Sequence, residues 1–364
     1  MTENAAETGR TLVVCLDGTS NEPESGTTNV ARMFAVSVKD PGQLVYYDPG
    51  VGTMGARGAV TPWGQRATRV AGLVGGYGVR DNLAEAYTFL LRHYQRGDRI
   101  FVFGFSRGAY TARALTGMLR TVGLLRPGAE NLVPYSVKLY ARKRPQHPTK
   151  EQEREGWRLA DRFTEQFGNP DFPHPFDRSR HQVHFLGVWD TVKSVGWLNW
   201  RARVEQVRWP FTARITNVGT ARHAMAIDER RRPYGVYRFD ADAVAESAGR
   251  FQEMWFAGVH SDVGGQFPDD HALSDLAFAW MVDEAVAAGL RVDPQAYRRQ
   301  VGVRYGEPLP PERALGRIHA TGGAWSLLGW RTRTIRPGDA VHPSVQVRME
   351  RTRDDRAPYL PRLP

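Results

Sequence analysis

Cysteine and lysine are both scarce in this chain of 364 residues. The single cysteine, Cys15, cannot form a disulfide within the chain, so the sequence gives no sign of an oxidising compartment. It also cannot supply a zinc site built from several cysteines. Only five of the 49 basic residues are lysines, and the remainder are arginines.

Long hydrophobic runs are absent as well. No stretch approaches the roughly 18 apolar residues that a membrane-spanning helix needs. The segment 1–10 is polar and carries acids, without the basic region and apolar run of a signal peptide. We therefore expect a disordered tail over 1–10 and a protein that is soluble and cytoplasmic when it is made.

The formal net charge of +10 needs an explanation. A basic excess can indicate nucleic acid or an anionic membrane surface as a partner. The sequence has no zinc-finger, RNP-like or basic-zipper pattern, so we expect no nucleic-acid partner. The simplest interpretation is an arginine bias along the whole chain. The membrane alternative rests on the C-terminal region, where tryptophan and arginine cluster within a dozen residues: Trp325, Trp330, Arg331, Arg333 and Arg336.

Apolar runs alternate with helical periodicity along the chain. We predict strands over residues 11–16, 44–47, 99–103, 183–189 and 254–259, and helices over 79–95, 109–122 and 273–287. The region 21–78 is rich in glycine and threonine and is expected to be mostly loop. Strands that alternate with helices predict an α/β fold, a mainly parallel sheet with helices on both faces.

The domain organisation follows from the same pattern. We expect one α/β-hydrolase catalytic domain over 11–349 and a C-terminal tail over 350–364. A polar segment at about 127–180, with a charged run from Lys138 to Arg162, suggests a helical cap or insertion.

A serine flanked by glycines joins a predicted strand to a predicted helix, in Gly104-Phe-Ser-Arg-Gly108. This context is typical of the nucleophile elbow, where a tight turn projects the serine hydroxyl into a cleft and small neighbours let the backbone close up. The alternative is a phosphate-binding turn, but no Lys-Ser or Lys-Thr pair of the P-loop type follows. Ser106 is therefore the candidate nucleophile, and the backbone N–H of Arg107 is a candidate donor to the oxyanion.

A serine nucleophile needs a histidine as base and a carboxylate to orient that histidine. Asp190 and His260 each end an apolar run, and the chain order Ser, Asp, His is usual for this fold. Groups at the carboxyl ends of parallel strands share one edge of the sheet. A competing assignment shifts both partners one strand along, to Asp262 as the acid and His342 as the base.

Asp17-Gly-Thr19 follows the first predicted strand and allows two roles. The backbone N–H groups of Gly18 or Thr19 could complete an oxyanion hole. Alternatively, Asp17 could be the nucleophile of an aspartate-based phosphoryl-transfer enzyme. That chemistry usually uses a second acid two residues away, and those positions hold Cys15 and Thr19.

Several blocks together resemble the catalytic domain of type VI secretion phospholipase effectors. They occur in order as Leu16-Asp-Gly-Thr19, Gly104-Phe-Ser-Arg-Gly-Ala109, Gly187-Val-Trp-Asp-Thr-Val192, His223-Ala-Met-Ala-Ile-Asp-Glu-Arg230 and Trp255-Phe-Ala-Gly-Val-His-Ser-Asp-Val-Gly-Gly265. The resemblance implies a Ser-Asp-His esterase that acts on phospholipid acyl esters without a metal or other cofactor. It places the roles on Ser106, Asp190 and His260, and it makes export by a specialised secretion system conceivable. A third hypothesis is an interaction module that keeps the fold but has no activity.

Overall fold

The computed structural model describes residues 9–18, 27–50, 77–142, 149–177, 179–192, 209–320 and 329–363. Its centre is a sheet of seven strands in the order β2-β1-β3-β4-β5-β6-β7, and every neighbouring pair is parallel. The strands are β1 (Thr11–Leu16), β2 (Gln43–Asp48), β3 (Arg99–Phe105), β4 (Val183–Trp189), β5 (Val218–Ala226), β6 (Phe251–Phe256) and β7 (Ala340–Val341). The α/β fold class is therefore confirmed.

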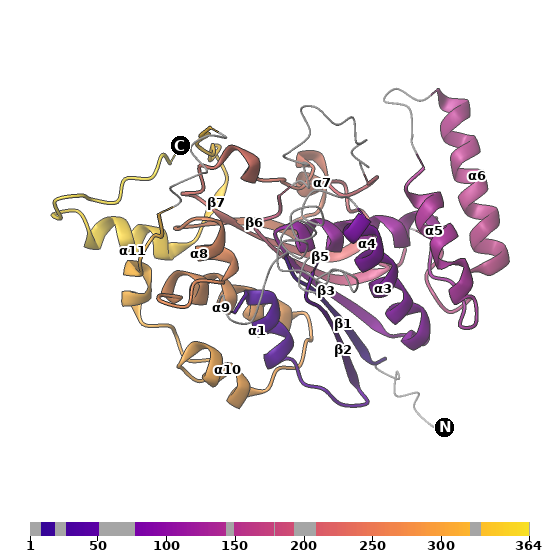
Figure 1. Cartoon of the computed structure of the whole chain (residues 1–364), viewed down its shortest axis with the longest axis horizontal. Coiled ribbons are helices and arrows are strands. Elements are labelled where there is room, and N and C mark those ends of the chain that lie inside the picture. The colour runs from indigo at the N-terminus through magenta and orange to yellow at the C-terminus, as the bar shows by residue number, and fades with distance from the viewer. Residues whose placement is uncertain are drawn as a thin grey trace, which may run out of the picture.

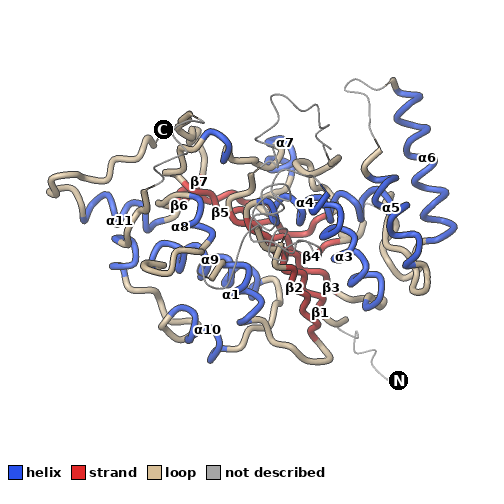
Figure 2. The backbone as a smooth tube through the Cα atoms, viewed as in Figure 1, coloured by secondary structure: helices blue, strands red, loops and turns tan. Residues whose placement is uncertain are grey.

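Helices cover both faces of this sheet (Figures 1 and 2). They are α1 (Asn29–Val36), α3 (Tyr77–His93), α4 (Arg107–Val122), α5 (Val133–Tyr140), α6 (Lys150–Phe167), α7 (Ala241–Glu246), α8 (His260–Gly264), α9 (Ala272–Ala287), α10 (Pro294–Val301) and α11 (Pro343–Arg351). On one face α3 and α4 pack on the strands, with α5 and α6 outside α4; on the other, α1 and α9 pack on the strands.

The alternation of side chains along β1 explains the two layers. Leu12, Val14 and Leu16 join the core under α3 and α4, whereas Val13 and Cys15 join the core under α1 and α9. All five are buried. A parallel strand that is buried on both faces is apolar at every position, as this run is. Burial also raises the pKa of the Cys15 thiol.

Several elements are absent from the sequence prediction, and α1 and β5 are examples whose sequences lack a strong periodic signal. The eight residues of α1 lie inside the region expected to be loop. The strand β5 was not predicted, because it reads Val-Gly-Thr-Ala-Arg-His-Ala-Met-Ala and has no β-branched run. The strand predicted over 254–259 begins and ends three residues earlier in the structure, as β6 (Phe251–Phe256). Gly258, at φ +115°, lies in the turn that follows β6.

The segment 127–180 contains α5 and α6, which pack beside α4 on one side of the sheet. Its role as a cap remains a prediction, as do the boundaries of the catalytic domain at 11 and 349. The chain after α11 is not isolated, because the Tyr359 hydroxyl donates a hydrogen bond to Asp228 Oδ2 (2.9 Å).

Candidate active site

Ser106 sits on the turn between β3 and α4 in a conformation that few residues adopt. Its backbone has φ 58° and ψ −119°, outside the common regions for a residue with a side chain. A Cβ at Gly104 would lie 2.6 Å from the carbonyl oxygen of Gly108, and one at Gly108 would lie 2.2 Å from that of Leu16. Both positions therefore require glycine, and together they permit the tight turn that presents the hydroxyl.

His260 lies between the serine and an aspartate. Its Nε2 is 2.8 Å from Ser106 Oγ, and its Nδ1 is 2.5 Å from Asp190 Oδ2. With the ring proton on Nδ1, the histidine donates to Asp190 and accepts from the Ser106 hydroxyl. The rings of Phe105 and Tyr234 lie 4.6 and 4.9 Å from the imidazole, centroid to centroid, and restrict its orientation. The structure thus brings the three sequence-predicted residues together at one edge of the sheet.

Asp190 follows β4 and is fully buried. The backbone N–H of Ala226 donates to its Oδ1 (3.0 Å), and Arg333 contacts both oxygens, with Nη1 2.5 Å from Oδ1 and Nη2 2.9 Å from Oδ2. Burial would raise the pKa of Asp190, but the charge of Arg333 and the hydrogen bond from His260 outweigh it and hold the pKa well below its usual range. The carboxylate is therefore ionised at neutral pH.

Arg333 belongs to the C-terminal cluster of tryptophan and arginine on which the membrane alternative rests, but its side chain is turned into the protein. Its side chain is 4% exposed, and it also donates to the carbonyl oxygens of Ala226 and Tyr234 (2.8 and 2.6 Å). No signal in the sequence joins it to Asp190, because the two lie 143 positions apart. Trp330, Arg331 and Arg336 are exposed, and Trp325 lies outside the described residues.

The sequence predicted three candidate donors to the oxyanion, Arg107, Gly18 and Thr19, and their surroundings in the structure differ. Arg107 is the first residue of α4, whose N-terminal end follows the serine directly. Backbone N–H groups and the positive end of the helix dipole lie at such a terminus. The N–H of Gly18, however, donates to Asp17 Oδ1 (2.7 Å), which takes up the proton expected for the oxyanion. Thr19 lies outside the described residues.

Asp17 is held by neutral donors at the end of β1. Besides the Gly18 N–H, it accepts hydrogen bonds from the hydroxyls of Tyr47 (2.9 Å) and Thr28. Thr28 is also the N-cap of α1, where its Oγ1 accepts from the Ala31 N–H (3.1 Å). These bonds join β1, β2 and α1, so the contacts of Asp17 favour a structural role over a nucleophilic one.

We expect Asp17→Asn to lower the free energy of unfolding by about 1–3 kcal/mol, because an amide cannot accept at both oxygen positions. Reaction of Ser106 with a fluorophosphonate should persist in the folded variant. Urea unfolding and active-site labelling measure the two effects, with the exposed Asp354→Asn as the matched control. A variant that keeps wild-type stability but no longer labels would restore a chemical role to Asp17.

The competing pair is not brought together. Asp262 Oδ1 lies 2.5 Å from Nδ1 of His319, a residue that the sequence analysis did not single out. His342 is the N-cap of α11, where its Nδ1 accepts from the Ser344 N–H (3.3 Å). Its ring stacks on Phe256, and burial lowers the pKa of His342 to about 4. The second assignment therefore lacks the aspartate–histidine contact that it requires.

The described ranges offer neither a metal site nor a membrane-spanning helix. They contain no group of three or more histidine, cysteine, aspartate or glutamate side chains placed to hold a metal ion. Among the helices of these ranges, none combines the length and the apolar character needed to cross a membrane.

The fold and this arrangement define an α/β-hydrolase-type protein with a serine at the strand-to-helix elbow. The family model for the type VI secretion system phospholipase effector Tle1-like catalytic domain matches residues 10–284. The chain belongs to this family, and the resemblance seen in its sequence motifs is confirmed.

One curated protein is similar in sequence over part of this chain. A protein of Saccharomyces cerevisiae described as uncharacterized is 31% identical over 239 residues, which cover 62% of this chain and 32% of the yeast protein. The chain thus spans about a third of the length of this curated relative.

Two solved structures are each 18% identical to this chain. One, of an uncharacterized protein from Pseudomonas aeruginosa, has a TM-score of 0.41 and covers 80% of this chain and 48% of that one. The other is the Tle1 effector bound to the VgrG spike of the type VI secretion system, with a TM-score of 0.32 and coverage of 71% and 51%.

Proposed function

We propose that this protein hydrolyses carboxylic esters of lipids, with phospholipid acyl esters as the substrate class. Ser106 is the nucleophile, His260 the general base and Asp190 the carboxylate that orients the base. The observation that carries the proposal is the continuous hydrogen-bonded path from Asp190 through His260 to a serine on a strained elbow. The membership of a phospholipase effector family supports the substrate class.

The geometry supports a two-step acyl transfer. Ser106 Oγ attacks the ester carbonyl carbon while its proton passes to His260 Nε2, and the negative charge on the carbonyl oxygen faces the N-terminal end of α4. Collapse of this intermediate breaks the ester C–O bond, and the imidazolium protonates the leaving alcohol. A water molecule then attacks the acyl-serine, again giving its proton to His260, and the fatty acid and free serine are released.

Reaction with a fluorophosphonate tests this proposal directly. We expect labelling of the folded full chain at Ser106, located by peptide mass spectrometry, and release of fatty acid from phospholipid vesicles. Phosphatase activity without labelling would support the phosphoryl-transfer alternative. If the folded chain shows no labelling and no hydrolysis, the result would support the inactive interaction module. Attraction to an anionic membrane and export by a specialised secretion system are further parts of this proposal.

Arg333 should act on the rate through Asp190. We expect Arg333→Gln to lower kcat about tenfold to a hundredfold with little change in KM. The reason is that Asp190, which orients His260, would lose the two-point contact that fixes its carboxylate. The kcat of Arg333→Lys should fall between those of the wild type and Arg333→Gln, because an ammonium keeps the charge but not the two-point contact. Steady-state kinetics on a nitrophenyl ester measure both, with the exposed Arg331→Gln as control. Equal activity of Arg333→Gln and Arg331→Gln would show that Arg333 does not position the acid.

A further inference from the structure

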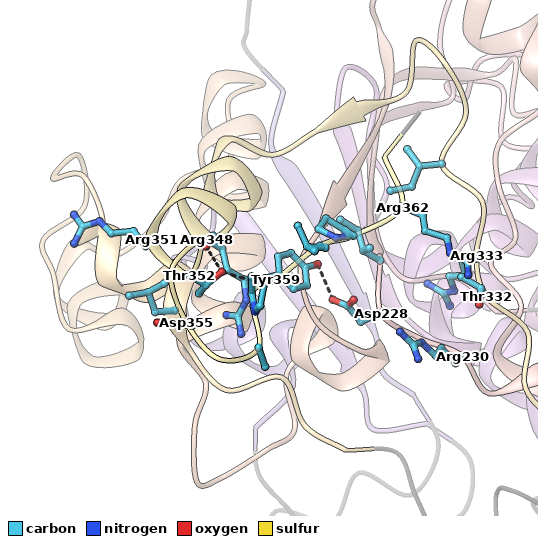
Figure 3. A pocket seen from close by; sticks show the side chains of 17 residues that line it. Asp228, Arg230, Thr332, Arg333, Arg348, Arg351, Thr352, Asp355, Tyr359 and Arg362 are labelled. Carbon is cyan, nitrogen blue, oxygen red and sulfur yellow. Dashed lines mark hydrogen bonds between the residues drawn. The ribbon is translucent and has the colours of Figure 1, made fainter.

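A cavity of about 760 Å³ opens beside the C-terminal part of the chain (Figure 3). Its walls come from the loop after β5, from the segment that carries Arg333, from α11 and from the residues that follow α11. This volume lies in the range of small-molecule sites. Most of the wall lies beyond residue 284, where the family match ends, so the family match covers only the part of the wall after β5.

The side chains around the cavity carry an excess of positive charge. Two aspartates and five arginines line it, the arginines being Arg230, Arg333, Arg348, Arg351 and Arg362. Arg333 is paired with Asp190, and Arg351 lies 3.8 Å from Glu312. Within the described ranges, the remaining three arginines have no carboxylate oxygen within 4.0 Å. The cavity therefore presents cations without directly paired counter-charges.

The two aspartates offset this charge only in part. Asp228 Oδ2 accepts hydrogen bonds from the Gly258 N–H (2.7 Å) and the Tyr359 hydroxyl (2.9 Å), both neutral donors. Burial raises the pKa of Asp228, and the charges of Arg348 and Arg230 oppose this rise only in part, without lying within ion-pair distance of the carboxylate. Asp355 is exposed, and water screens its charge.

Arg348 is the most firmly held of the three unpaired arginines. Its Nη1 donates to the carbonyl oxygens of Ala314 and Gly316 (both 2.7 Å), and its Cζ lies 5.1 Å from the centre of the Tyr359 ring. Its Nε is buried and has no hydrogen-bond partner in the described part of the chain. Burial lowers the pKa of Arg348, and Asp228, Asp262 and Asp270 oppose this shift without forming an ion pair with the guanidinium. Carbonyl groups and a ring orient this half-buried cation, so it keeps the capacity to pair with an anion.

Apolar side chains adjoin these arginines. Leu315 and Leu360 both line the cavity, and they are 39% and 76% exposed, which is unusual for large apolar residues of this protein. Cationic donors beside exposed leucines suit a phosphate group that carries an apolar body. Arginine is well matched to phosphate, because its planar fork can donate two parallel hydrogen bonds.

We propose that this cavity is a binding site for a terminal phosphate group, held by Arg230, Arg348 and Arg362. The group reaches the site either as the headgroup of an acidic lipid or as free phosphate. The site is separate from the serine that attacks the ester, and the proposal does not depend on hydrolysis.

Binding is measured on the full chain with Ser106→Ala, so that lipid is not consumed. One arm titrates inorganic phosphate by calorimetry. The other sediments the protein with vesicles of phosphatidylcholine alone or with phosphatidic acid added. The test variant is Arg230→Met/Arg362→Met, whose two side chains are exposed and should leave the fold intact. Arg348→Met is a second variant. The matched control is Arg298→Met/Arg299→Met, which removes two exposed positive charges from α10.

We expect the test variant to bind at least about tenfold more weakly than its parent, a loss expected when charge-assisted hydrogen bonds are removed. The α10 control should bind like the parent. Loss in both arms assigns the site to a lipid headgroup, and loss in the phosphate arm alone assigns it to soluble phosphate. Equal losses in the test and control variants, or no binding in either arm, would overturn the proposal. Fluorophosphonate labelling of the wild-type serine is independent of these outcomes.

Discussion

Replacing the Ser106 hydroxyl with hydrogen, in Ser106→Ala, is expected to lower the turnover of a nitrophenyl ester by about 10⁴-fold or more. The reason is that His260 Nε2 would face a methyl group, and no other atom at the elbow could form the acyl intermediate. Stability should change little, because alanine and serine both carry a Cβ and meet the same constraint at φ 58°.

The control for this variant is Ser261→Ala, which removes a hydroxyl beside His260 that bonds to Gln266 rather than to the histidine. It should retain most of the activity. Circular dichroism and thermal unfolding establish that both variants are folded. Near wild-type turnover by folded Ser106→Ala would end the proposal of a serine hydrolase.

The second large effect concerns the choice of base. We expect His260→Ala to lose about 10⁴-fold or more in kcat, because the serine loses its proton acceptor and Asp190 loses the group that it orients. His342→Ala should cost about 1 kcal/mol of stability through loss of the α11 N-cap and leave kcat close to wild type.

The two alanine variants are compared at several pH values under conditions in which both are folded. His342 is the matched control because it also follows a strand, and its ring stacks on Phe256 as the His260 ring packs on Phe105. If His342→Ala were the damaging change and His260→Ala the mild one, the roles would move to Asp262 and His342.

Much of the fold follows from local sequence patterns. The apolar runs that become β1 and β4 coincide with the predicted strands, because strands buried on both faces require apolar residues at nearly every position. Among the elements that were missed, α1 and β5 have a short or mixed sequence pattern. Their conformation depends on neighbours: β5 is a strand because β4 and β6 pair with it on either side.

The elbow could be located from the sequence alone, since two glycines around a serine between a strand and a helix form a local pattern. The sequence also indicated the aspartate and the histidine, because strand ends can be located from composition. Only the tertiary structure decided which groups meet: His260 contacts residues 70 and 154 positions away, and Arg333 reaches across 143 positions to Asp190. The physical reason is that such contacts depend on the order of strands in the sheet and on the path of the C-terminal segment, which no local pattern encodes. The same applies to Asp17, whose neutral partners come from β2 and from the start of α1.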